Sequence, residues 1–183
     1  MKTTLKISLV LLLSTIYFSC NNNETVNEKN TTFKSDAYYK LDQEKWVQVG
    51  KVENNVPSIM VNKDKLINSL EANLLKYSQL YVGFTDVYIY ENFDNYHLVF
   101  KGAKYTTSLY LEMSDTKVLY ARGDTTCTTT ECSQEPLGCV VKYDLSKPGA
   151  PGYCSPCDNG GKCTKTVSNK ALIIVNDEDL IEY

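Results

Sequence analysis

Cysteine is the residue type that gives this sequence its clearest capacity for chemistry. Six of the seven cysteines fall within one segment of 37 residues, with the spacing C-x4-C-x6-C-x14-C-x2-C-x5-C: Cys127, Cys132, Cys139, Cys154, Cys157 and Cys163. The segment is rich in Thr, Gly and Pro and offers little hydrophobic core, which cross-links can replace. An even number of cysteines in such a segment predicts three disulfides, and the spacing does not choose among the possible pairings.

Part of this segment resembles two known motifs. Cys154-Ser155-Pro156-Cys157 resembles the redox motif of thioredoxin-like proteins, which needs its first cysteine at a helix N-terminus. Glycines on both sides disfavour a helix there. The stretch from Cys157 to Cys163 is similar to the C-x-N-G-G-x-C stretch of epidermal-growth-factor-like modules. That family has further cysteines after this stretch, whereas none follows Cys163 here. We therefore keep redox activity as a lesser alternative and do not assign the growth-factor fold.

Metal binding is the remaining alternative for the cysteines. Paired thiolates at short spacing are ligands of zinc and of iron–sulfur clusters. The candidate zinc ligands are Cys127 and Cys132 with Cys154 and Cys157, and a cluster would add Cys139 or Cys163. Because thiols outside the cytoplasm oxidise to disulfides, we expect no bound metal or cofactor.

Residues typical of catalysis are sparse. His97 is the only histidine, and on a predicted strand it is most simply an ordinary sheet residue. Four carboxylates flank predicted strands, where acidic side chains are usually solvated: Asp86, Glu91, Asp94 and Glu112. The acidic cluster at 176–179 lacks a calcium-loop pattern. No nucleophile elbow, phosphate-binding loop, dinucleotide fingerprint or zinc-protease motif occurs, so we expect a protein that is not an enzyme.

The seventh cysteine, Cys20, lies at the end of a predicted export signal. Lys2 and Lys6 precede an apolar run over 7–18, and the small residue Ser19 stands directly before Cys20. A basic start, an apolar run of about a dozen residues and a small residue at the cleavage point are typical of a secretory signal. The run is shorter than the roughly twenty residues that a bilayer span needs.

The stretch Tyr17-Phe18-Ser19-Cys20 resembles the lipobox of bacterial lipoproteins. That resemblance implies removal of a signal peptide, 1–19, and acylation of Cys20, so that the membrane is a partner through the lipid. The expected location is the bacterial cell envelope, at the periplasmic side of the outer membrane or at the cell surface. Loss of Lys2 and Lys6 shifts the formal net charge from −3 to −5. An acidic chain argues against nucleic acid as a partner.

Hydrophobic periodicity predicts one domain after a linker. Residues 20–35 have almost no apolar content and are expected to form a flexible linker, and residues 36–183 form the domain. Apolar residues at three- and four-residue steps predict an amphipathic helix over 63–80. An antiparallel meander follows, with strands at about 84–91, 96–102, 105–113 and 117–122. We expect the helix to pack on the apolar face of this meander.

The cysteine-rich segment, 123–170, is expected to be an insertion in this domain. It contains one strand-like island at 139–143, and the apolar run 171–175 after it predicts a buried final strand. The predicted fold class is therefore α+β, with one amphipathic helix packed on an antiparallel β-meander and a disulfide-rich insertion before the last strand.

The opposite face of the predicted sheet is aromatic and hydroxylic, and it includes a possible binding face: Tyr88, Tyr90, His97 and Tyr110. Either the N-terminal segment or the cysteine-rich segment covers this face, or it is exposed. Tyrosine offers rigid, amphipathic contact area that suits a protein or carbohydrate partner. We therefore expect a non-enzymatic binding or interaction module. An accessory subunit of an envelope complex is the first alternative, and a redox or metal protein is the second.

Overall fold

The computed structural model describes residues 33–93, 95–144, 146–147 and 149–181. The predicted signal peptide, Cys20 and the linker as far as residue 32 lie outside these residues. The helices are α1 (Asp36–Lys40), α2 (Lys63–Ser78) and a short 3-10 helix, η1 (Asp177–Asp179). The strands are β1 (Trp46–Glu53), β2 (Val56–Ile59), β3 (Phe84–Asn92), β4 (Asn95–Gly102), β5 (Thr106–Met113), β6 (Val118–Thr129), β7 (Val140–Lys142), β8 (Tyr153–Ser155) and β9 (Thr164–Val167).

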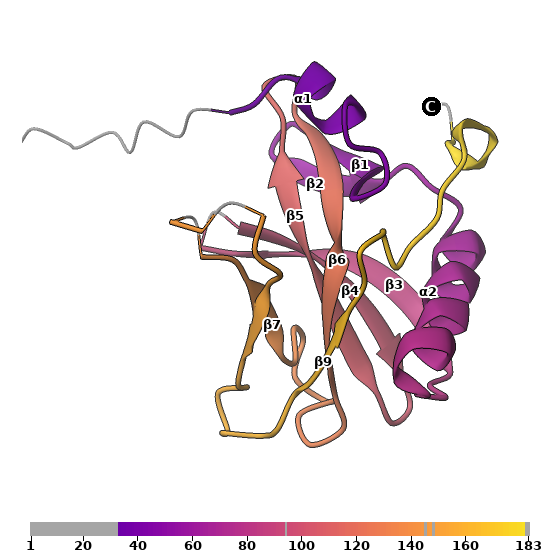
Figure 1. Cartoon of the computed structure of the whole chain (residues 1–183), viewed down its shortest axis with the longest axis vertical. Helices are drawn as coiled ribbons and strands as arrows, with labels where there is room; N and C mark the ends of the chain where they lie inside the picture. Colours follow the sequence, from indigo (N-terminus) through magenta and orange to yellow (C-terminus); the bar gives the residue numbers. More distant parts are fainter. Residues whose placement is uncertain (1–32, 94, 145, 148, 182–183) are drawn as a thin grey trace, which may run out of the picture. The chain divides into compact units, whose positions relative to one another are not determined.

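The fold is α+β, as predicted (Figure 1). Antiparallel strands form one sheet in the order β2-β1-β6-β5-β4-β3, and β9 pairs with the second half of β6. β7 and β8 form a separate two-stranded sheet within the cysteine-rich segment. None of the helices in the described part of the chain is long and apolar enough to cross a bilayer.

α2 confirms the predicted amphipathic helix and ends two residues earlier than expected. The Asn62 side chain caps its start by accepting hydrogen bonds from the backbone N–H groups of Asp64 (2.9 Å) and Lys65 (3.2 Å). Gln79 ends it in the left-handed conformation, with φ of 55°. Four side chains at helical spacing are buried: Leu66, Ile67, Leu70 and Leu74.

The main core lies between α2 and the apolar face of the meander. Cross-strand pairing places Leu98 of β4 opposite Ile89 of β3 and Leu109 of β5, so that these side chains share one face. Six buried apolar residues of the three strands belong to one cluster with the α2 leucines: Phe84, Val87, Leu98, Phe100, Leu109 and Leu111. The predicted packing of the helix on this face is confirmed.

The C-terminal part of the domain differs from the prediction in two places. β6 continues to Thr129, well past the expected end at 122, and Gly123 inside it permits a close approach, since a Cβ there would lie 2.9 Å from Cβ of Ala171. The strand predicted at 171–175 is wrong. Leu172 and Ile173 are fully buried in the core, but this segment forms no strand, and its backbone contacts are single bonds such as Leu172 N–H to Gly123 O (2.7 Å).

The apolar run at 171–175 therefore predicted the burial of Leu172 and Ile173 correctly, whereas Ile174 is 61% exposed and the predicted strand pairing is wrong. The last strand is β9, which follows Cys163, so the disulfide-rich insertion does precede the last strand of the sheet.

Candidate functional site

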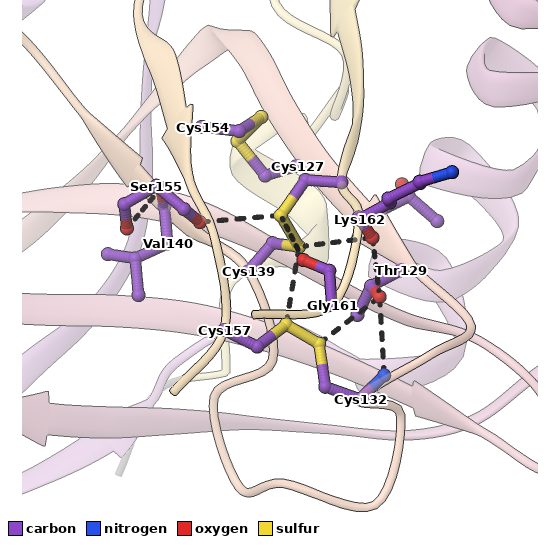
Figure 2. Close-up of a disulfide and its surroundings, with 12 residues drawn as sticks. Cys127, Thr129, Cys132, Cys139, Val140, Cys154, Ser155, Cys157, Gly161 and Lys162 are labelled. Atoms are coloured by element: carbon purple, nitrogen blue, oxygen red, sulfur yellow. Dashed lines mark hydrogen bonds between the residues drawn. A yellow bond between two sulfur atoms is a disulfide. The ribbon is translucent and has the colours of Figure 1, made fainter. Parts of the chain in front are cut away.

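The six clustered cysteines form three disulfides, which confirms the main prediction for them. The pairs are Cys127–Cys154, Cys132–Cys157 and Cys139–Cys163, with Cα–Cα distances of 5.6, 6.4 and 5.9 Å. Each first-half cysteine pairs with its counterpart in the second half, in chain order. We call residues 130–163, with these cross-links, the cysteine module. Its three overlapping loops tie β7 and β8 to the end of β6 (Figure 2).

This pairing removes the groups that the redox and metal alternatives need. Cys154 and Cys157 belong to different disulfides, and Cys154 lies in β8 rather than at the start of a helix. The sulfur atoms of Cys132, Cys139 and Cys157 lie within 4.8 Å of one another and are buried. Each of them is already bonded to another sulfur, whereas a metal requires thiolates. The convergence of these sulfurs therefore reflects the packing of two disulfides, with Cys139 Sγ 3.6 Å from Cys157 Sγ.

The cysteine module packs on the outer face of the sheet, the face that the sequence marked as tyrosine-rich. Thr106 Oγ1 donates a hydrogen bond to Ser133 O (2.9 Å), and Ser108 Oγ donates to Cys139 O (2.5 Å). The Tyr88 hydroxyl donates to the backbone oxygen of Pro136. Sheet hydroxyls thus satisfy backbone carbonyls of a segment that has little regular structure of its own. The structure therefore agrees with the interpretation in which the cysteine-rich segment covers this part of the face.

His97 lies beneath this cover and is only 3% exposed. Burial, with a smaller contribution from the charge of Lys142, lowers the pKa of His97 to about 4. Its Nδ1 atom has no hydrogen-bond partner within the described part of the chain, and its ring packs edge-on against Tyr110 at 5.9 Å. His97 is therefore a packing residue with no accessible surface for a partner, while Tyr88, Tyr90 and Tyr110 are half-buried.

A polar cluster joins the module to β6. The Arg122 guanidinium lies 3.8 Å from the centre of the Tyr143 ring, and its Nε is 3.3 Å from an oxygen of Asp124. The Tyr143 hydroxyl donates to the other oxygen of Asp124 at 2.6 Å. Burial and the neighbouring Asp124 carboxylate raise the pKa of Tyr143. Asp124 is 6% exposed, so this network compensates a charge that would otherwise be buried without partners.

A second group of aromatic rings fixes α1 on the other end of the same face. Tyr39 of α1 stacks on Tyr120 with 4.4 Å between ring centres, and the edge of Trp46 meets Tyr39 at 5.1 Å. The Tyr120 hydroxyl donates to Asp36 (3.2 Å), and burial together with this carboxylate raises the pKa of Tyr120 to about 12. Tyr39 donates to Glu112 (3.2 Å). Both tyrosines are therefore neutral and held in place.

A cavity with a volume of about 380 Å³ opens beside these rings. We call it the α1 pocket. Its walls come from α1 and the loop after it, from β1 and from the C-terminal segment, which lie far apart in sequence. The aromatic part of the lining is Tyr39, Trp46 and Tyr120. The polar part is Lys40, Gln43, Gln48 and Asn176.

The side chains of the α1 pocket are suited to hydrogen bonding. Three amide side chains each offer donors and an acceptor, and Lys40 adds one cation. Among the described residues that line it, none is a carboxylate, a cysteine or a histidine. This pocket was not predicted from the sequence. The only local signal was the aromatic residues between 38 and 46, and no sequence pattern relates them to the C-terminal segment.

A smaller cavity of about 250 Å³ lies between α2 and the loop before β3. The one carboxylate in its lining, Glu71, accepts a hydrogen bond from the backbone N–H of Phe84 (2.6 Å) and so serves the loop. We therefore take the α1 pocket as the candidate site. Comparison with protein families, curated proteins and solved structures gives no match.

Proposed function

We propose that this chain is a lipid-anchored lipoprotein of the bacterial envelope whose disulfide-bonded domain binds a hydroxyl-rich ligand, with a saccharide as the best-fitting class. The binding site is the α1 pocket. The observation that carries the proposal is the combination, in one cavity, of a largely buried aromatic wall with three amide side chains and with no carboxylate among the described residues that line it.

The disulfides support the envelope location. Three cross-links of ordinary Cα separation form and persist in oxidising compartments, which an export signal would reach. They also account for six of the seven cysteines. Cys20 is then left with no cysteine of its own chain to pair with, which suits a sulfur that carries an acyl chain.

The chemistry of the pocket supports the ligand class. A saccharide hydroxyl donates and accepts hydrogen bonds at once, as does a Gln or Asn amide. The Trp46 ring packs against Tyr39 and is only 8% exposed, so it gives the cavity a rigid apolar wall of small area beside the amide side chains. Lys40 would favour a sugar that carries a negative charge over one that carries a positive charge.

A direct test is a glycan array probed with the full-length chain, followed by titration of each positive glycan with Trp46 fluorescence as the signal. Trp46 is the only tryptophan and lines the pocket. Each lost hydrogen bond to the ligand contributes about 1–1.5 kcal/mol, so Gln43→Ala with Asn176→Ala is expected to weaken binding about 30- to 100-fold. The control is Gln134→Ala, an exposed amide on the cysteine module.

Equal loss of affinity in the Gln134 control, or unchanged affinity in the pocket variant, would contradict the assignment of the site. An array without any positive glycan, together with a co-purifying envelope protein, would instead support the accessory-subunit alternative.

A further inference from the structure

Three large apolar side chains around α1 are exposed although the helix itself is packed. Phe33 and Tyr38 are each 45% exposed, and Leu41 is 87% exposed. Tyr38 and Leu41 are three residues apart at the end of α1 and therefore lie on the same side of the helix. Lys34 Nζ lies 4.3 Å from the centre of the Tyr38 ring, and Phe33 directly precedes Lys34 in the chain. We call Phe33, Tyr38 and Leu41 the α1 patch.

The charge around the α1 patch is balanced, unlike that of the chain. Residues 33–45 contain three lysines and three acidic residues. Lys34 pairs with Glu112 (3.1 Å) and Lys45 with Asp42 (3.5 Å). The mature chain would carry a formal net charge of −5, which anionic lipid headgroups repel. The α1 patch combines exposed apolar side chains with no net charge and is therefore suited to approach a lipid surface.

The α1 patch is also the first part of the described domain after the proposed lipid. Twelve residues, 21–32, separate Cys20 from Phe33. A chain of this length reaches at most about 45 Å when fully extended. An acyl chain on Cys20 would thus hold the bilayer surface within that distance of α1.

We infer that the α1 patch contacts the interfacial region of the bilayer that holds Cys20, with Phe33, Tyr38 and Leu41 inserted at the depth of the headgroups and the acyl boundary. This inference rests on the proposed lipid anchor. Aromatic rings and leucine on one side of a short amphipathic element, with lysines that reach outward, are typical of such contacts. Because α1 also forms one wall of the α1 pocket, the pocket would lie next to the membrane surface.

The test uses the full-length acylated protein in phosphatidylcholine vesicles that contain a small fraction of lipid with a dansyl headgroup. Energy transfer from Trp46 to dansyl measures how near α1 lies to the bilayer, because Trp46 packs on Tyr39 of α1. The test variant is Phe33→Ser, Tyr38→Ser and Leu41→Ser combined. The control replaces three exposed apolar residues of other regions by Ser: Val56, Tyr81 and Phe93, which are 64%, 83% and 92% exposed.

We expect transfer efficiency to fall at least two-fold in the test variant and to stay unchanged in the control. Equal transfer in the test variant and the wild type would overturn the inference, as would an equal fall in the control. Flotation with the vesicles separates this result from the anchor, since an acylated protein floats whether or not α1 touches lipid. Far-ultraviolet circular dichroism and mapping of the three disulfides establish that both variants are folded.

Discussion

Acid is expected to destabilise this domain through its single histidine. His97 is 3% exposed beneath the cysteine module, and burial lowers its pKa to about 4 from an ordinary value of 6.5. Between these two values the unfolded chain binds a proton that the folded chain does not bind, so stability rises with pH across this window. Below the lower value both states are protonated, and above the upper value neither is.

The size of the effect follows from the pKa difference. One pKa unit corresponds to about 1.4 kcal/mol, so lowering the pH from about 7 to about 4.5 should remove about 2.5 kcal/mol of unfolding free energy through His97 alone. The assay is urea unfolding of the wild type and of His97→Gln at both pH values. Subtracting the pH effect of the variant from that of the wild type cancels the contribution of carboxylates.

The single imidazole also gives a direct reading by nuclear magnetic resonance. A titration midpoint near 6.5, or the same pH dependence in wild type and variant, would refute the reasoning, because either result means that water reaches His97. The prediction therefore tests whether the cysteine module closes over the outer face of the sheet in solution.

Three further predictions concern the free energy of unfolding, measured with urea. Replacing Cys139 and Cys163 by Ala opens a loop of about 25 residues and should cost about 3.5 kcal/mol in the chain-entropy relation, and a loss below about 1 kcal/mol would contradict a formed cross-link. Tyr143→Phe leaves the buried Asp124 short of a hydrogen bond and should cost about 1.5–3 kcal/mol, against less than about 0.5 for the half-exposed Tyr153→Phe. Asn62→Ala removes the cap of α2 and should cost about 1 kcal/mol, whereas Asn62→Asp should retain most of the stability.

The parts of the fold that could be predicted are those with a local period. α2 and the strands β3 to β5 repeat apolar residues every 3.6 or 2 positions, so their existence and their buried faces followed from the sequence. The cap at Asn62 is local as well, because its side-chain oxygen accepts hydrogen bonds from the first turn of the helix that follows it. Such features depend on neighbours within a few residues.

The features that could not be predicted depend on contacts between distant segments. Apolar content at 171–175 indicates burial, but only the approach of this segment to Gly123 and α2 decides that it does not pair as a strand. The cysteine spacing is compatible with any pairing, and the packing of the module on β5 and β6 selects one. The α1 pocket needs side chains from Tyr39 and from Asn176, which no local pattern connects.

The excess of tyrosine is explained by local sequence patterns together with contacts between distant segments. Of the fourteen tyrosines, several lie in two groups of ring contacts between the outer face of the sheet and its two covers: Tyr110 of the sheet with Tyr143 of the module, and Tyr120 of the sheet with Tyr39 of α1. Tyrosine suits these boundaries because its ring packs while its hydroxyl reaches a carboxylate or the solvent.

The most direct test of the lipid anchor is the mass of the mature protein purified from the envelope of an expressing bacterium. We expect a chain that begins at Cys20, carries acyl chains on that residue and retains three disulfides, while Cys20→Ser accumulates as an unacylated precursor. A wild-type chain that begins at Met1, or that is cleaved before Cys20 but carries no lipid, would contradict it.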